Sequence, residues 1–289
     1  MKAKYSLVLG GVIVLAAIFR LLFLFELRVS PDFAAPRFDA GYHDYWARGL
    51  ATGDWTPPAY RPDPRIQASP YFRPPGYPYF LAGLYRIFHG NLLWVRAAQM
   101  AMGVLNCLLA YFFGAGLFGR RPGLVYSVLM SIYWSFINFE GEFLEPVLLV
   151  FLGLVFFLLV LRWLEKRSPF ILFAAGLVTG IYALTSPNVL LFIPVAVLWI
   201  AFVRARDDTW RIAFRNAGVY VLGAVVAIGP ATIRNAVVAR DTVLISSNAG
   251  INLYIGNNET ADGFSASAPE VGEWSCFEFP GIVNRLERE

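Results

Sequence analysis

Long apolar runs, separated by short polar gaps, follow one another along most of this chain. Seven such runs lie at residues 7–25, 95–118, 122–138, 143–161, 170–185, 188–203 and 214–233. Most of them are long enough to cross a bilayer, because a helix rises about 1.5 Å per residue and roughly 20 residues span the hydrocarbon core. The pattern therefore predicts an all-α polytopic membrane protein with about seven transmembrane helices.

The first run and the two shortest runs carry additional signals. Lys2 and Lys4 precede the first run, which is longer than the core of about 7–15 residues in a cleaved signal peptide. We therefore expect an uncleaved first helix. The runs 170–185 and 188–203 meet at Pro187, which breaks a helix. They form either two crossing helices or one buried hairpin that does not cross the membrane twice.

Basic residues are concentrated in every second gap between the runs. These gaps hold Arg120 and Arg121, then Arg162, Lys166 and Arg167, then Arg204, Arg206, Arg211 and Arg215. Because cytoplasmic loops carry an excess of lysine and arginine, this alternation places the N-terminus in the cytoplasm. The segments expected on the outer side are 28–94, 138–142, 186–188 and 234–289.

Composition supports the same assignment. The chain has 289 residues, of which 57% are hydrophobic and only 15% charged, whereas a soluble domain has roughly 25% charged residues. The net charge is +4, but the basic residues form no block or stripe, so we expect no nucleic-acid partner. Cys107 lies in an apolar run and Cys276 in the polar tail, so we expect no disulfide between them.

The outer segment 28–94 is long and rich in proline, tyrosine, tryptophan and arginine. Within it, the aromatic stretch from Tyr79 to Phe88 is too short to cross a bilayer and contains Arg86. An amphipathic helix lying in the headgroup plane fits this stretch best. The sequence therefore predicts a large outer loop that carries juxtamembrane helices.

Acidic residues are nearly absent from the middle of the apolar runs, which counts against an ion-coupled carrier. They gather instead at the outer ends of the expected helices. One group holds Asp39 and Asp44, and the other holds Glu140, Glu142 and Glu145. Both groups fall on the outer side, where they can line one cavity at the membrane–water boundary.

Asp39 and His43 share a face if their segment is helical, since they are four residues apart. The alternative for Asp39 is a solvated loop acid that caps a helix. Five outer arginines, Arg61, Arg65, Arg73, Arg96 and Arg234, depart from the inside preference of basic residues. They either pair with headgroups and carboxylates or grip a phosphate, for which a guanidinium is well shaped. Carboxylates and arginines on one side of the membrane favour transfer from a phosphate-bearing lipid.

Several segments in order resemble the GT-C glycosyltransferases. The nearest branch is the group related to protein O-mannosyltransferases and the lipid A aminoarabinose transferase. The matching segments run from Asp39 to Gly53, from Arg73 to Pro78, from Glu140 to Leu144, over Arg234-Asn235 and from Gly250 to Asn258. Each motif is weak by itself, but together they cover nearly the whole chain.

The resemblance implies a seven-helix module, a polyprenyl-phosphate sugar donor and an inverting transfer to an acceptor hydroxyl. It implies that Asp39 is catalytic and that Arg73 contacts the donor phosphate. Glu142 would be a carboxylate that either supports the site from behind or lies near the acceptor, and Asp44 is a rival to Asp39. The candidates for substrate binding are Arg73, Tyr77, His43, Glu140, Arg96 and Arg234. Some relatives need a divalent metal and others do not, and no ligand set here compels one.

The chain departs from the family pattern at Ser186, where many relatives have arginine. We expect a catalytic module over 1–235 and an extracytoplasmic segment over 236–289 that begins a truncated C-terminal region. The expected location is the plasma (inner) membrane, with the active site outside the cytoplasm and membrane lipids as neighbours. The acceptor is a glycan, a lipid or a protein. The alternative function is a non-enzymatic one in envelope glycan assembly, as a lipid-carrier flippase or a scaffold subunit.

Overall fold

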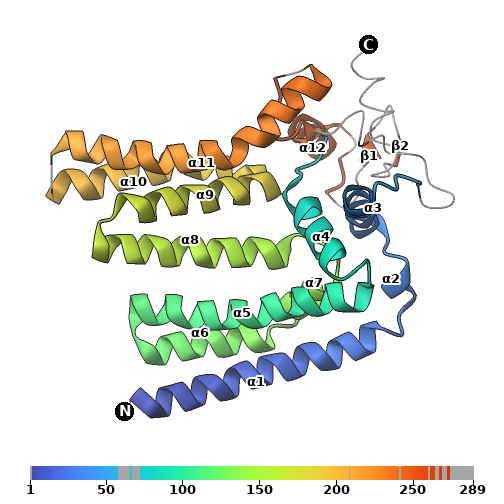
Figure 1. Ribbon diagram of the computed structural model, residues 1–289, viewed down its shortest axis with the longest axis horizontal. Helices are drawn as coiled ribbons and strands as arrows, with labels where there is room; N and C mark the ends of the chain where they lie inside the picture. The colour runs from blue at the N-terminus through green and yellow to red at the C-terminus, as the bar shows by residue number, and fades with distance from the viewer. Residues whose placement is uncertain are drawn as a thin grey trace.

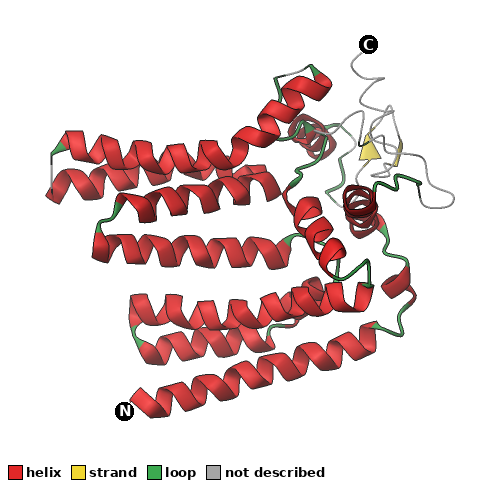
Figure 2. Cartoon of the chain, viewed as in Figure 1, coloured by secondary structure: helices red, strands yellow, loops and turns green. Residues whose placement is uncertain are grey.

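The computed structural model describes residues 2–57, 66, 72–207, 209–240, 242–259, 261–263, 267–268 and 272–273. Arg61, Arg65 and Cys276 lie outside the described residues, whereas Cys107 is a buried free thiol. Helices make up nearly all of the described chain (Figure 2). They are α1 Lys2–Leu27, α2 Pro31–Ala34, α3 Phe38–Thr52, α4 Gly76–Ile87, α5 Leu92–Phe118, α6 Arg120–Ile132, α7 Trp134–Gly141, α8 Pro146–Lys166, α9 Pro169–Thr185, the 3₁₀ helix η1 Pro187–Leu191, α10 Phe192–Asp207, α11 Trp210–Ala239 and α12 Asn248–Asn257. Two short strands, β1 Ser267–Ala268 and β2 Gly272–Glu273, pair antiparallel.

Within the part of the chain that the structure describes, five helical segments are long and apolar enough to cross a membrane. They are Lys4–Leu27, Leu92–Phe118, Pro146–Lys166, Pro187–Arg204 and Trp210–Val238. The apolar helix α9 is shorter, with 17 residues, and α6 has 13. These helices lie alongside one another as a bundle (Figure 1). The expectation of an all-α polytopic membrane protein is confirmed.

The apolar run at 122–138, expected as one helix, forms two. α6 ends at Ile132, Tyr133 has an extended backbone, and α7 begins at Trp134. The break leaves the last carbonyls of α6 without helical partners, and Arg20 of α1 donates from Nη1 to the Ser131 carbonyl at 3.3 Å. A buried cation that is distant in sequence therefore supports the break.

The helices α9 and α11 pack at close range because each has glycines that lie directly against the backbone of the other helix. A Cβ at Gly176 or Gly180 would run into the backbone of α11 at Tyr220 or Ala224. Likewise, a Cβ at Gly223 would meet the Phe173 carbonyl of α9. Small residues allow such approach in membrane helix pairs, where van der Waals packing replaces the hydrophobic driving force.

Three shorter helices, α3, α4 and α12, gather at one end of the bundle (Figure 1). The helix expected from Tyr79 to Phe88 is present as α4, and it lies obliquely to the bundle. Its residues Tyr77, Leu81 and Tyr85 are buried against the rest of the fold, whereas Tyr79 is exposed. This arrangement places polar side chains of α3 and α4 over the ends of α8 and α9.

Candidate active site

A polar cavity of about 680 Å³ lies at the end of the bundle where α3, α4 and α12 gather. Its ionisable lining residues are Asp39, His43, Arg73, Tyr77 and Glu145. The remaining lining residues are Pro74, Phe139, Leu144, Pro146, Thr185, Ser186, Pro187, Asn188, Ser246, Asn248, Ala249, Asn252, Leu253 and Asn257. A cavity of this size is typical of sites that bind small molecules.

An ion pair between Asp39 and Arg73 stands at the wall of this cavity. Arg73 Nη2 lies 2.9 Å from Asp39 Oδ1, and the side chains are 18% and 54% exposed, respectively. The Arg73 guanidinium also lies over the Tyr42 ring, 5.0 Å from its centroid. Asp39 is in the first turn of α3, where the helix dipole favours a negative charge. It does not cap the helix, since the N-cap residue is Arg37.

His43 lies one turn after Asp39 on α3, as the spacing predicted. Its Nδ1 is 3.0 Å from the carbonyl oxygen of Phe143. A carbonyl only accepts, so Nδ1 carries the hydrogen and Nε2 of the neutral ring remains an acceptor. Burial lowers the pKa of His43, while Glu145 and the Phe143 carbonyl act in the opposite direction. The ring is therefore neutral near pH 7.

The segment that joins α7 to α8 is held by side chains of α5. Gln99 donates from Nε2 to the carbonyls of Glu140, at 3.2 Å, and Glu142, at 2.9 Å. Arg96 donates from Nε to the Gly141 carbonyl at 2.9 Å. The Tyr77 hydroxyl donates to Oε1 of Gln99. Together with His43 at Phe143, these bonds occupy the four successive carbonyls of residues 140–143. The first two belong to the end of α7, where carbonyls lack helical partners, and the other two lie beyond it.

The acidic segment contributes Glu145, rather than Glu140 or Glu142, to the lining of the cavity. Glu145 directly precedes the first residue of α8, and its side chain makes no capping hydrogen bond there. Glu142 is half-buried, and this burial raises the pKa of its carboxyl, an effect that nearby Arg96 opposes. The sequence grouped all three acids, but spacing alone did not indicate which of them faces the cavity.

Glu140 forms a buried ion pair with Arg20, a residue that was not among the sequence candidates. Arg20 Nε lies 2.6 Å from Glu140 Oε2 and Nη2 lies 2.8 Å from Oε1, with side-chain exposures of 2% and 4%. A Cβ at Gly103 would collide with the Glu140 carboxylate. The signal for Arg20 was a charge inside the first apolar run, which in a membrane helix requires a partner.

Two further candidates lie outside the cavity. Asp44 is buried, and its carboxylate accepts from Arg48 Nη2 at 2.8 Å and from the Tyr85 hydroxyl. The guanidinium of Arg96 lies between the rings of Phe33 and Phe143, 4.4 and 4.2 Å from their centroids. Both side chains are thus engaged within the protein.

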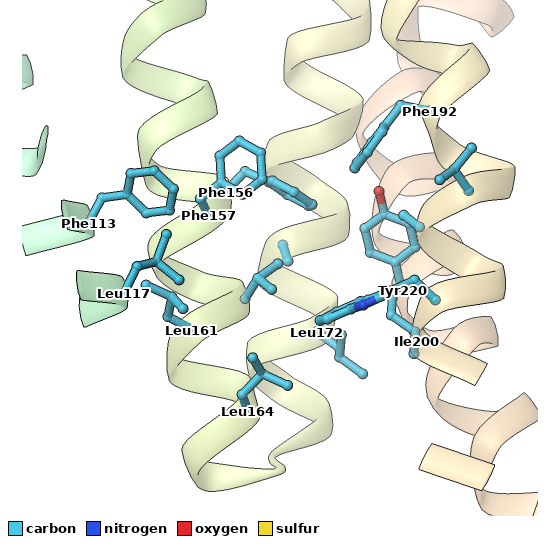
Figure 3. A pocket seen from close by; sticks show the side chains of 15 residues that line it. Phe113, Leu117, Phe156, Phe157, Leu161, Leu164, Leu172, Phe192, Ile200 and Tyr220 are labelled. Atoms are coloured by element: carbon cyan, nitrogen blue, oxygen red, sulfur yellow. The ribbon is translucent and has the colours of Figure 1, made fainter. Parts of the chain in front are cut away.

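Arg234 lines a second cavity, of about 630 Å³, which is bounded by α4, α9 and α11. A third cavity, of about 420 Å³, lies between the helices of the bundle. It is lined by apolar and aromatic residues of α5, α8, α9, α10 and α11 (Figure 3). Within the described residues, no group of three or more histidine, cysteine or acidic side chains is placed to hold a metal ion.

Comparison with known proteins decides the family. The pattern of the dolichyl-phosphate-mannose-protein mannosyltransferase family matches residues 72–232, which is more than half of the chain. The protein belongs to this family. It is therefore a membrane-bound glycosyltransferase of the GT-C superfamily, which favours the enzymatic interpretation of the sequence over the non-enzymatic one. No curated protein and no solved structure matches the chain. The family match includes Arg73, Tyr77 and Glu145 but begins after α3.

Proposed function

We propose that this protein transfers a sugar from a polyprenyl-phosphate donor to an acceptor hydroxyl, with inversion at the sugar carbon. The observation that carries the proposal is the pair of Asp39 and Arg73 in one polar cavity at the end of a membrane bundle. A carboxylate and a guanidinium side by side match the two needs of this reaction, a proton acceptor and a phosphate contact.

Asp39 takes the proton of the acceptor hydroxyl while the oxygen of that hydroxyl attacks the sugar carbon. The bond from that carbon to the phosphate oxygen breaks, and the polyprenyl phosphate leaves with the bonding electron pair. Arg73 stabilises the negative charge that develops on the phosphate. A single displacement of this kind inverts the configuration, as in the inverting glycosidases. His43 offers Nε2 to a hydroxyl of the substrate.

Glu145 is the second carboxylate of the site in this proposal, the role that the resemblance implied for Glu142. It lines the cavity, and its charge opposes the lowering of the His43 pKa by burial. We place its carboxylate near the acceptor. Arg96, Glu140 and Asp44 then act through packing and hydrogen bonds within the protein, while Arg234 lines the separate cavity beside α4, α9 and α11.

We further propose that the cavity faces the outside of the plasma membrane and that the N-terminus is cytoplasmic. α8 starts at Pro146 beside the cavity and ends at Lys166, so the basic gap at 162–167 lies at the opposite end of the bundle. The positive-inside rule assigns that end to the cytoplasm. In this arrangement residues 1–235 form the transmembrane module, and α12 adds outer residues to its cavity. The acceptor is a glycan, a lipid or a protein, as in the branch of protein O-mannosyltransferases and the lipid A aminoarabinose transferase.

The test measures incorporation of labelled sugar from polyprenyl-phosphate donors into membranes that contain the protein. Asp39→Asn is expected to lower transfer by about 10²–10⁴-fold, the usual contribution of a general base. The matched control is Asp32→Asn, because Asp32 forms an equally close pair with Arg37, at 2.9 Å, but does not line the cavity. Transfer by Asp39→Asn above a tenth of the wild-type rate would rule out Asp39 as the base.

A further inference from the structure

The lining of the cavity divides into a charged part and an uncharged part. The charged side chains come from α3, from Arg73 and from Glu145. The uncharged polar side chains come from the end of α9, from η1 and from α12 with the residues just before it. They are Thr185, Ser186, Asn188, Ser246, Asn248, Asn252 and Asn257. Four of these seven are asparagines, so amides dominate this part of the wall.

Two of the amides face the cavity with their hydrogen-bonding groups unused. Asn188 and Asn252 are exposed, and within the described residues neither amide has a hydrogen-bond partner. Their neighbours are engaged: Asn248 accepts from Ser246 at 3.1 Å, and Asn257 donates to the Leu253 carbonyl at 2.8 Å. The two open amides belong to separate elements, η1 and α12, so they line the cavity from two distant segments of the sequence.

An amide presents two N–H donors and a carbonyl acceptor in one plane. A sugar hydroxyl both donates and accepts, so an amide can bond two hydroxyls without any charge on either partner. Arg73 cannot replace this function, because a guanidinium only donates. The charged part of the cavity fits a phosphate and a reacting hydroxyl, which leaves the amides for the remainder of the donor.

We propose that Asn188 and Asn252 bind the hydroxyls of the sugar ring and thereby determine which donor the enzyme accepts. This inference rests on the proposed function, since it assumes that the donor phosphate lies at Arg73. Asn252 follows the region that matches the family, whereas Asn188 lies within it. The donor is thus held at its phosphate by a cation and at its sugar by neutral amides.

The experiment compares the affinity of the full chain in lipid nanodiscs for two probes, polyprenyl phosphate and the same lipid carrying a hexose. Wild-type protein is expected to bind the hexose-bearing lipid at least about tenfold more tightly, since each amide contributes roughly three- to tenfold. The double variant Asn188→Ala/Asn252→Ala is expected to bind both lipids equally. Its affinity for bare polyprenyl phosphate should match that of wild type, which also shows that the variant is folded.

The matched control is Asn258→Ala, since Asn258 follows α12 and does not line the cavity. It should keep the full preference for the hexose-bearing lipid. A preference that survives in the double variant, or that is missing in wild type while both lipids bind, overturns the sugar subsite and leaves the proposed function standing. If wild-type protein binds neither lipid, the proposed function and the subsite both fall.

Discussion

The interior of the bundle and the polar cavity at its end each contain a carboxylate paired with an arginine, but the two pairs are buried to very different degrees. Arg20 and Glu140 are almost fully enclosed and form two short contacts. Asp39 and Arg73 form one contact, and Asp39 keeps more than half of its side chain exposed. The two pairs therefore differ in the exposure of their side chains. The first pair is too buried to contact a ligand, whereas both partners of the second pair line a cavity.

The same difference predicts opposite consequences for the two pairs. Removing one partner of a buried pair leaves an uncompensated charge, which destabilises a protein strongly. Removing one partner of a half-exposed pair costs little stability, because solvent screens the remaining charge. Substitutions in the interior should therefore change folding, whereas substitutions at the cavity should change transfer.

Breaking the interior pair is expected to have the largest effect on stability. Arg20→Met should lower the free energy of unfolding by about 3–5 kcal/mol, because Glu140 is then buried without its partner. The double variant Arg20→Met/Glu140→Met should be more stable than Arg20→Met alone, since no charge is stranded. Unfolding titrations in mixed micelles measure both. A double variant as unstable as the sum of the two single variants would contradict a direct interaction.

The hydrogen bonds of Gln99 connect the two regions, so its substitution should affect both stability and catalysis. Gln99→Leu leaves the Tyr77 hydroxyl and two carbonyls unsatisfied, each at a cost of about 1–3 kcal/mol. We also expect a lower kcat with little change in the KM for the donor, because the segment that carries Glu145 loses its support.

Asn106→Leu is the matched control for Gln99. Asn106 is also a buried amide of α5, and it donates to the Val147 carbonyl at 3.1 Å, but neither residue lines the cavity. It should destabilise the fold while kcat per folded molecule stays the same. A double-mutant cycle of Gln99→Leu with Tyr77→Phe should be non-additive for kcat, and additive effects would argue against positioning through this bond.

The acids of the α7–α8 segment offer a smaller and more selective test. Glu145→Gln should slow transfer about tenfold, the effect of one lost charge interaction of about 1.4 kcal/mol. Glu142→Gln should stay within about threefold of wild type, since Glu142 does not line the cavity. Both variants should be equally stable. A larger loss of transfer in Glu142→Gln than in Glu145→Gln would mean that Glu142, as the resemblance implied, is the second carboxylate of the site.

How far the sequence predicted this protein depended on the range of the interactions involved. The apolar runs indicated the membrane bundle, and the spacing of Asp39 and His43 indicated their shared face, because both patterns are local. The break at Tyr133 was missed because no local signal in the apolar run indicates it, and the Arg20 side chain that bonds the Ser131 carbonyl there is 111 residues away in sequence. The family motif located the acidic segment, but which of its acids lines the cavity depends on the path of the chain between α7 and α8, and no sequence spacing reports that path.

The smallest expected effect concerns the pH dependence of stability, and the two histidines of the chain allow it to be isolated. Burial lowers the pKa of His43 in the folded protein below its unfolded value of about 6.5. As the pH falls below that value, the unfolded chain binds a proton that the folded protein does not, so stability decreases. The loss levels off once the pH is below the folded pKa. Glu145, Asp39 and Arg73 face the ring and set how wide this window is.

His43→Gln removes this titration and can still donate a hydrogen bond to the Phe143 carbonyl. Its stability should therefore fall less than that of wild type between about pH 7 and about pH 5. His89→Gln is the control, because His89 is exposed after α4 and does not line this cavity. Equal slopes for His43→Gln and wild type would mean that the ring is not held neutral. The Nε2 acceptor that the cavity offers to a substrate hydroxyl would then be lost.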